Sequence, residues 1–380
     1  MSSAQGPIPD PAAWLPATLN RGHRYRDRVS EPAASISAFY AARYGHSDRA
    51  VWERRLVAGE IRLNGRQLRA DGPLAPGDRL VWHRPPWQEA AVPVLGERSI
   101  VFDDGDLLVL NKPSGLPVLP AGGFLLHTLL AQLEGWAAGG RLDAAAGLPR
   151  PVHRLGRFTS GLLVCARRPT SRAWLSALLR ESTTPAARSA PSSGHPAGHP
   201  PPARGCLKLY RALLTPPPPG SPLLALAEVG PPGPGSPDAA APDAGADVPG
   251  PPAAAPDLWI DTPIGRRPHA RLGALWAAAE PGDPAALPAR SAVRLIAQRP
   301  EGWLVAVTIA SGRPHQIRIH TAAAGAPLLG DPLYGPGGLP RGEVLPGEGG
   351  YLLHAHRLEL PLADGRRLVL EAPLPAALAD

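Results

Sequence analysis

The chain has 380 residues, enough for two domains with a sizeable core, and it carries 39 basic and 32 acidic residues, a formal net charge of +7. Its two cysteines exclude a disulfide framework and a cysteine-rich metal site. No apolar stretch approaches the roughly 18 residues that a transmembrane helix requires, and the N-terminus lacks the apolar segment of a signal peptide. We therefore expect a soluble, cytoplasmic protein.

Positive charge is concentrated near the N-terminus. Residues 20–88 contain 13 arginines and 7 acidic residues, a net charge of +6 (13 − 7). Because the guanidinium group forms bidentate contacts with phosphate, this segment indicates a nucleic-acid-binding face. A GC-rich genome would explain the overall ratio of 37 Arg to 2 Lys equally well, but the location of the charge is more telling.

Two helices and two strands are predicted within this basic segment. The apolar residues have helical spacing over Ile36–Tyr44 and Val51–Val57, and strand-like alternation over 60–65 and 79–83. With its Asn-Gly and Pro-Gly-Asp turns, this order resembles the αL RNA-binding motif of several ribosomal proteins. The resemblance implies that basic side chains of the helices and the following strand face RNA, namely Arg43, Arg49, Arg54, Arg55 and Arg62. The alternative is a small α/β cap with a solvated basic face.

Segments rich in Pro, Ala and Gly divide the chain, because such sequence buries too little apolar surface to offset its ordering entropy. Residues 1–22 are predicted to be disordered, and residues 83–93 to form an extended linker. The same composition predicts disordered insertions at 182–205 and 230–258. The expected organisation is therefore a module with its linker at 23–93, followed by a larger domain at 98–375.

The stretch Pro151–Arg167 stands out in the larger domain. His153 and Arg154 precede a turn at Gly156, and Thr159-Ser160-Gly161 precede the apolar run Leu162–Ala166, which predicts a buried strand. Polar side chains on a loop that enters a buried strand are well placed to meet a substrate. Further strands are predicted at Leu107–Leu110, 206–214, 292–297 and 303–309, and helices at Leu126–Leu133 and Thr170–Arg180.

The central stretch resembles the signature of the RluA-type pseudouridine synthases, which reads His-Arg-Leu-Asp, a short spacer, then Thr-Ser-Gly-Leu-Leu. Five further motifs occur in the order typical of that family. One lies before the central stretch, at Asn111–Val118, and four lie after it, at Lys208–Ala212, Gly312–His320, Gly330–Gly335 and Leu353–Leu358. The resemblance departs at one position, since Gly156 stands where the family has its catalytic aspartate.

The resemblance implies an α+β fold with a mixed, mostly antiparallel sheet flanked by helices. It also implies an RNA pseudouridine synthase that isomerises uridine in ribosomal or transfer RNA as a monomer, without cofactor or metal. The catalytic positions would be Gly156, Tyr210 and Arg318, and the apolar floor of the cleft Leu352 and Leu353. The residues expected to face RNA are Lys112, Arg154, Thr159, Ser160, Arg313, His315 and Gln316.

Glycine supplies neither a nucleophile nor a base, so two alternatives stay open. Another carboxylate reaches the site, with Asp331, Asp106 and Asp104 as the candidates, or the protein binds RNA without isomerising it, for example in ribosome assembly. A buried guanidinium without a partner is costly. Arg318 is therefore expected either to have found another acceptor or to lie exposed enough for an RNA phosphate.

Overall fold

The computed structural model describes residues 14–143, 146–180, 206–229, 257–269, 272–309, 312–342, 344–362 and 365–380. Within these ranges, no helix combines the length and apolar character needed to cross a membrane. The predicted insertion 182–205 lies outside them, as does all of 230–258 except its last two residues. Leu258 opens strand β14 (Leu258–Ile260), which corrects the C-terminal end of the second insertion.

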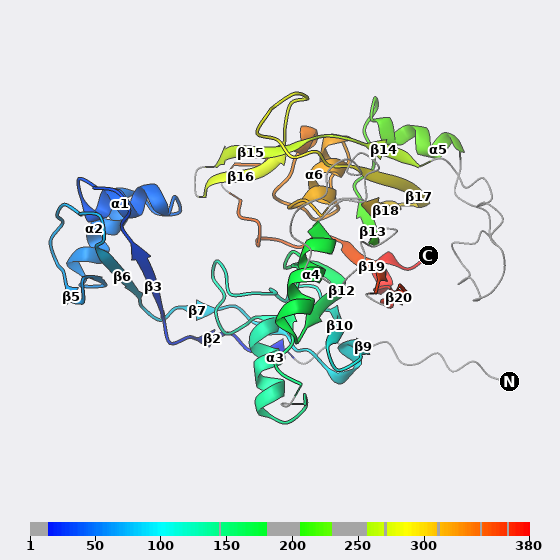
Figure 1. Ribbon diagram of the computed structural model, residues 1–380. Helices are drawn as coiled ribbons and strands as arrows, with labels where there is room; N and C mark the ends of the chain where they lie inside the picture. The colour runs from blue at the N-terminus through cyan, green and yellow to red at the C-terminus, as the bar shows by residue number, and fades with distance from the viewer. Residues whose placement is uncertain are drawn as a thin grey trace.

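The N-terminal module consists of two helices on a four-stranded antiparallel sheet (Figure 1). The helices are α1 (Ile36–Arg43) and α2 (Arg49–Val57), and the strand order is β3 (His23–Arg28), β6 (Arg79–Arg84), β4 (Ile61–Leu63) and β5 (Arg66–Gln67). Ser35 and Asp48 cap the two helices through side chains that accept backbone N–H groups. Tyr40, Trp52 and Trp82 fill the core between the layers. The predicted helices and strands of this segment are confirmed.

A paired ribbon joins the module to the rest of the chain. Strand β1 (Trp14–Leu15) pairs with β8 (Val92–Pro93), and β2 (Thr18–Leu19) pairs with β7 (Gln88–Glu89). Residues 14–22 were predicted to be disordered, and this pairing corrects that prediction. It also corrects the prediction that 83–93 is a simple extended linker, because part of it pairs with the N-terminal strands. Glu89 closes the junction, because its buried carboxylate accepts hydrogen bonds from the Asn20 side chain and from two backbone N–H groups of the following domain.

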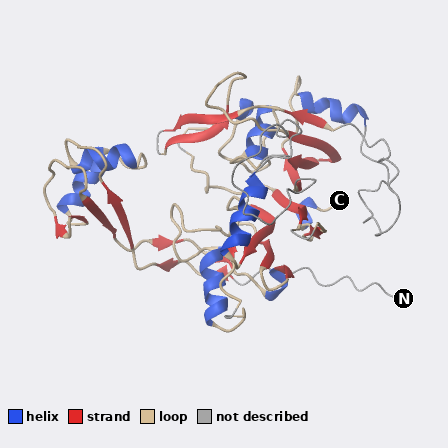
Figure 2. Ribbon diagram, in the orientation of Figure 1, coloured by secondary structure: helices blue, strands red, loops and turns tan. Residues whose placement is uncertain are grey.

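A ten-stranded sheet forms the larger domain, and its strands run through the middle of the view in Figure 2. The order is β14-β17-β18-β13-β19-β12-β10-β9, with β11 beside β12 and β20 beside β19. Only the β12–β19 pairing is parallel among the pairs described. The bounds are β9 Ile100–Asp103, β10 Leu107–Lys112, β11 Arg150–Pro151, β12 Thr159–Ala166, β13 Leu207–Leu214, β17 Ser291–Arg299, β18 Gly302–Ile309, β19 Leu353–Pro361 and β20 Arg367–Glu371. The expected α+β fold with a mixed, mostly antiparallel sheet is confirmed.

Within the described ranges, four α-helices and a separate hairpin accompany this sheet. The helices are α3 (Leu129–Ala138), α4 (Pro169–Arg180), α5 (Ala225–Val229) and α6 (Gln316–Ala323), and the hairpin is β15 (Ile264–His269) with β16 (Gly273–Ala278). Helix α3 begins three residues later than predicted. Thr128 caps it, whereas the N–H groups of Leu126 and His127 are already bonded to Glu89.

The centre of the sheet depends on one close approach. Every residue of β12 is buried, and Gly161 (φ 99°) lies beside Ala355 of β19 in the parallel pair. A Cβ at Gly161 would lie 2.2 Å from the Ala355 carbonyl oxygen, so only glycine allows the two strands to pair there. This pairing brings the loop before β12 next to the residues that precede β19.

Candidate active site and RNA-binding face

The loop at residues 153–158 is held by the Asn-Lys-Pro motif. The Lys112 ammonium is fully buried and donates to the carbonyl oxygens of Pro113, Leu116 and Arg157 at 2.8–2.9 Å. Burial, and then the charge of Arg157, lower the pKa of Lys112 to about 7. Its position corrects the expectation of an RNA contact, because all three donors of the ammonium are used to join two loops of the protein.

Gly156 is required by space rather than by backbone conformation. Its φ lies outside the left-handed region, unlike that of Gly161. A Cβ at this position would lie 2.2 Å from the Tyr351 hydroxyl oxygen and 3.3 Å from Thr159 Oγ1. The two hydroxyl groups are themselves 3.1 Å apart. A tyrosine hydroxyl therefore occupies the place where a side chain at residue 156 would begin.

Arg318 is paired with an acidic side chain, which is the first of the two arrangements expected for it. Its Nε and Nη2 donate to the two carboxylate oxygens of Asp331, both at 2.7 Å, and both side chains are almost completely buried. The guanidinium carbon lies 4.3 Å from the Tyr351 ring centroid and 5.1 Å from that of Tyr334. The cation therefore sits directly against the tyrosine that fills the space at Gly156.

None of the three candidate carboxylates replaces the missing aspartate. Asp331 is saturated by Arg318 and by backbone N–H groups, including that of Leu333 at 2.9 Å. Asp106 directly precedes Leu107 of β10, which pairs with Ala166 at the far end of β12. Gly156 lies before the opposite end of β12, near Gly161. Five residues of strand separate the two ends, about 17 Å. Asp106 instead accepts from Ser171 and the Arg168 N–H, and Asp104 lies beyond it at the same end.

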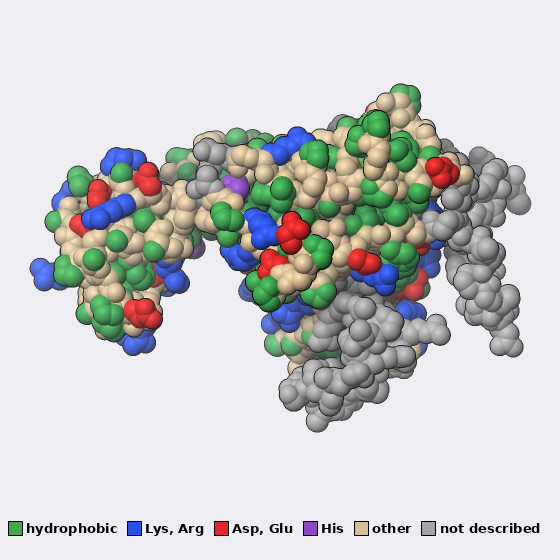
Figure 3. All heavy atoms as spheres, turned by 90° about the horizontal axis from the view of Figure 1, so that it is seen from above, with side chains coloured by type: hydrophobic (Ala, Val, Ile, Leu, Met, Phe, Trp, Pro, Cys, Tyr) green, Lys and Arg blue, Asp and Glu red, His purple; other side chains and the backbone are tan. Residues whose placement is uncertain are grey.

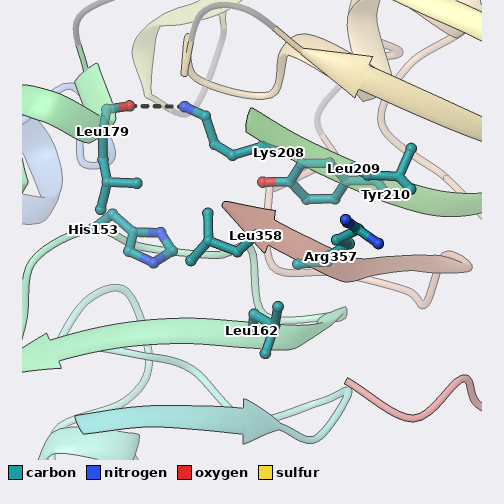
Figure 4. A pocket seen from close by; sticks show the side chains of 9 residues that line it. His153, Leu162, Leu179, Lys208, Leu209, Tyr210, Arg357 and Leu358 are labelled. Carbon is teal, nitrogen blue, oxygen red and sulfur yellow. Dashed lines mark hydrogen bonds between the residues drawn. The ribbon is translucent and has the colours of Figure 1, made fainter. Parts of the chain in front are cut away.

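Tyr210 lines a small cavity on the His153 side of the same loop (Figure 4). The cavity has a volume of about 10 Å³, enough for about one water molecule and far too small for a uracil ring. Burial raises the pKa of Tyr210 above its ordinary value and lowers that of His153 to about 3. His153 accepts a hydrogen bond from the Val164 N–H, and Lys208 donates to the Leu179 carbonyl. Binding of a base beside Tyr210 therefore requires this cavity to open.

Two of the residues expected to face RNA have structural contacts instead. Ser160 is buried and bonded to His354 Nδ1 at 2.8 Å. Gln316 is buried and donates to the Arg290 carbonyl and the Ser291 hydroxyl. Buried polar groups with such partners stabilise the fold, and this corrects the expectation for both residues. Thr159 is also buried, but its hydroxyl bonds to Tyr351 within the site.

Three predicted residues stay near the surface. Arg154 is exposed, and Arg313 and His315 are partly exposed. Arg313 donates from Nε to the Pro288 carbonyl, and His315 shares a 2.7 Å hydrogen bond with the Tyr334 hydroxyl. Among the contacts predicted in the larger domain, these three have the freest access to a bound RNA.

Tyr351 is the site residue that sequence reasoning missed. Its position directly before the Leu352-Leu353-His354 motif is the only signal in the sequence that points to it. Leu353 is buried in the core as expected of an apolar floor, and Leu352 is half-buried.

The helices of the N-terminal module do not present free arginines as expected. Arg43 pairs with Asp27 at 2.5 Å and Arg49 with Glu53 at 2.9 Å. Arg55 lies against the indole rings of Trp52 and Trp82, 4.2 and 4.4 Å from their centroids. Of the four helical arginines, Arg54 alone is exposed without a described partner, which corrects the expected RNA contacts of Arg43 and Arg55.

The opposite face of the same sheet carries the unpaired charge. Arg24, Arg26 and Arg28 of β3 are exposed, and the register places them beside His83, Val81 and Arg79 of β6. Arg62 of β4 lies on the other side of Val81. Within the described residues none of these arginines forms an ion pair. We call Arg24, Arg26, Arg28, Arg62 and Arg79 the basic sheet face; Figure 3 shows basic side chains spread over the module.

The comparisons with known proteins agree with the motifs. Residues 106–187 match the family described as RNA pseudouridylate synthase. An uncharacterised RNA pseudouridine synthase of Synechocystis sp. is 35% identical over 344 residues, which cover 90% of this chain and 94% of the relative. RNA pseudouridine synthase 5 of Arabidopsis thaliana is 34% identical over 398 residues, covering 95% of each chain. Ribosomal large subunit pseudouridine synthase D of Neisseria meningitidis is 28% identical over 340 residues, covering 87% of this chain and 72% of the relative.

Proposed function

The chain belongs to the RluA-type RNA pseudouridine synthases, which isomerise uridine to pseudouridine in RNA, and we propose that its substrate is ribosomal RNA. A relative that is 28% identical over 340 residues is named for the large ribosomal subunit. The basic sheet face suits a long, folded RNA, because phosphate contacts supply affinity and position the protein without reading sequence. We further propose that the protein acts as a monomer in the cytoplasm.

One observation carries the catalytic part of this proposal: the family motifs are joined by direct contacts around residues 153–159. Lys112 holds the Arg157 carbonyl, and Thr159 bonds to Tyr351. Tyr351 in turn lies against Arg318, which is paired with Asp331. A chain that only bound RNA would have no need of a buried cation placed beside the loop that would meet the ribose.

The first prediction tests this function with the full-length protein. Uridine carrying tritium at C5 loses the label to water when C5 becomes bonded to the ribose. We expect tritium release from transcripts of ribosomal RNA and none from transfer RNA. Release from transfer RNA alone would show that the protein is an active synthase but would refute ribosomal RNA as its substrate.

The matched control is Tyr210→Phe, which keeps the ring and removes only the hydroxyl. The family resemblance gives Tyr210 a role beneath the base, so release should fall by about 100-fold or more. If the native protein binds both RNAs with high affinity and releases no tritium from either, the second candidate function holds. That candidate is a non-catalytic RNA-binding protein, and Gly156 is the residue that favours it.

A further inference from the structure

We propose that the Tyr351 hydroxyl performs at C1′ of the target uridine the role that the missing carboxylate has in the family. This inference rests on the proposed function. The observation behind it is positional, because the hydroxyl oxygen lies 2.2 Å from where the Cβ of residue 156 would be. The space that a side chain from the loop before β12 would take is thus filled by a side chain from the segment directly before β19.

The Tyr351 ring is fixed on both sides, which aims the hydroxyl. The Arg318 guanidinium lies against it at 4.3 Å from the centroid, and the Phe158 ring meets it edge-on at 6.0 Å. Thr159 Oγ1 bonds to the hydroxyl at 3.1 Å. A group held in this way needs little reorganisation to reach a reacting atom, and Arg318 lies where it stabilises negative charge developing on the phenol oxygen.

The chemistry balances without a cofactor. The phenol oxygen forms a bond to C1′ as the bond from C1′ to N1 breaks, and the phenolic proton passes to the departing uracil. After the uracil has turned, its C5 forms a bond to C1′ and the bond from C1′ to the phenol oxygen breaks. The phenolate then takes the proton from C5, which restores the tyrosine. Tyrosine is the nucleophile at the anomeric carbon of the sugar in sialidases, so the step has chemical precedent.

The burial of Tyr351 is consistent with this role and sets one condition. Its side chain is only 3% exposed, so a ribosyl group bonded to it would be shielded from hydrolysis. Phe158 is half-buried and covers the ring edge. The loop carrying Phe158 must therefore shift when the ribose enters, as the small cavity beside Tyr210 also requires.

The test is Tyr351→Phe in the full-length protein, which keeps both ring contacts and removes only the hydroxyl. We expect the single-turnover rate of tritium release to fall at least about 100-fold. The RNA concentration giving half-maximal rate should stay within error of the native value, and the thermal midpoint should fall by no more than a few degrees, because Thr159 Oγ1 loses its buried partner. Thr159→Val, which removes the neighbouring hydroxyl at nearly constant volume, should lower the rate by a smaller factor.

The outcomes separate this inference from the proposed function. If native protein releases no tritium, the proposed function fails. If native protein is active and Tyr351→Phe is equally active, the inference fails and the function stands. A loss of rate accompanied by a matching loss of RNA affinity, or by a fall in the thermal midpoint larger than that of Thr159→Val, would assign the hydroxyl a structural role, and that too would overturn the inference.

A reciprocal exchange provides the second test. In Gly156→Asp the new Cβ would collide with the Tyr351 hydroxyl. In the background of Tyr351→Phe the nearest atoms are Thr159 Oγ1 at 3.3 Å, a tight contact that a small shift of the side chain relieves, and the ring carbon at 3.6 Å, an ordinary contact. Gly156→Asp/Tyr351→Phe should therefore fold and recover at least about tenfold of the rate lost in Tyr351→Phe. A double variant that is folded, binds RNA and recovers no activity would place C1′ elsewhere and contradict the proposal.

Discussion

At residue 156 the missing side chain is compensated by a neighbour, and the charge that a carboxylate would have balanced is balanced elsewhere. Arg318 is held by Asp331 from the Gly-Asp motif, 13 positions away. Because the pair is buried and bidentate, its loss leaves an uncompensated charge in a medium of low polarity. Asp331 is thus assigned to holding the cation in place, and the reacting group is sought at Tyr351.

Asp331→Asn tests that assignment. The variant leaves the Arg318 charge without a counter-charge, so we expect the free energy of unfolding to fall by about 3 kcal/mol, measured by urea denaturation. Glu53→Gln is the control, since its pair with Arg49 is exposed and should be worth less than about 0.5 kcal/mol. A variant as stable as the native protein but devoid of activity would instead give Asp331 a direct part in the reaction.

At the scale of elements, the N-terminal sheet uses its two faces differently. On one face, Trp82 and Ile61 pack beneath α1 and α2. Most arginines of these helices contact partners within the module. The other face carries the basic sheet face. Its arginines lie close enough to His83 to shift the pKa of that side chain. Burial, and then the charges of Arg62, Arg24 and Arg26, lower the pKa of His83.

The triple variant Arg24→Gln/Arg26→Gln/Arg28→Gln should therefore weaken RNA binding more than the helix variant Arg43→Gln/Arg49→Gln/Arg54→Gln. If each sheet arginine contacts one phosphate, the slope of log affinity against log salt should become shallower by about 2–3 units, because fewer counterions are released. The helix variant should change the slope by about one unit at most. Equal slopes in the two variants would contradict the assignment of RNA to the sheet face.

For the whole molecule, buried neutral histidines link stability to pH. His320 and His354 are both inaccessible to solvent, and burial lowers the pKa of each to about 4. His320 donates to the Thr262 carbonyl, and His354 is bonded to Ser160. In the unfolded chain both would titrate near 6.5. Between pH 6.5 and 4 these two histidines are therefore protonated in the unfolded state and neutral in the folded state.

Stability should consequently fall as the pH drops below 6.5, by about 1.4 kcal/mol per pH unit for each of these two histidines. His153 and His315, whose pKa values burial lowers to about 3, add to the slope in the same direction. The measurement is the free energy of unfolding in urea at pH 7.5, 6.5 and 5.5 and constant ionic strength. His354→Gln should reduce the slope by about one proton. A free energy that is constant from pH 6.5 to 5.5 would refute the prediction.

The sequence by itself determined the family and, through the family's short motifs, the fold class, and local periodicity located four of the α-helices and the central strands of the larger sheet. The spacing of apolar residues is a property of neighbours in the chain, so α2, β12 and β13 could be located from it within a few residues. The sequence also showed that a carboxylate is absent at Gly156.

Tertiary structure alone decided which side chain fills the space at Gly156 and which charges remain free. Thr159 and Tyr351 are 192 positions apart, and Asn20 and Glu89 are 69 apart, so no local pattern connects them. The same holds for Lys112 and Arg55: composition predicts that basic side chains are exposed, but their burial depends on carbonyls and indoles supplied from elsewhere in the fold. Partners brought together by strand pairing and packing carry no signature in the order of the residues, and the site depends on such partners.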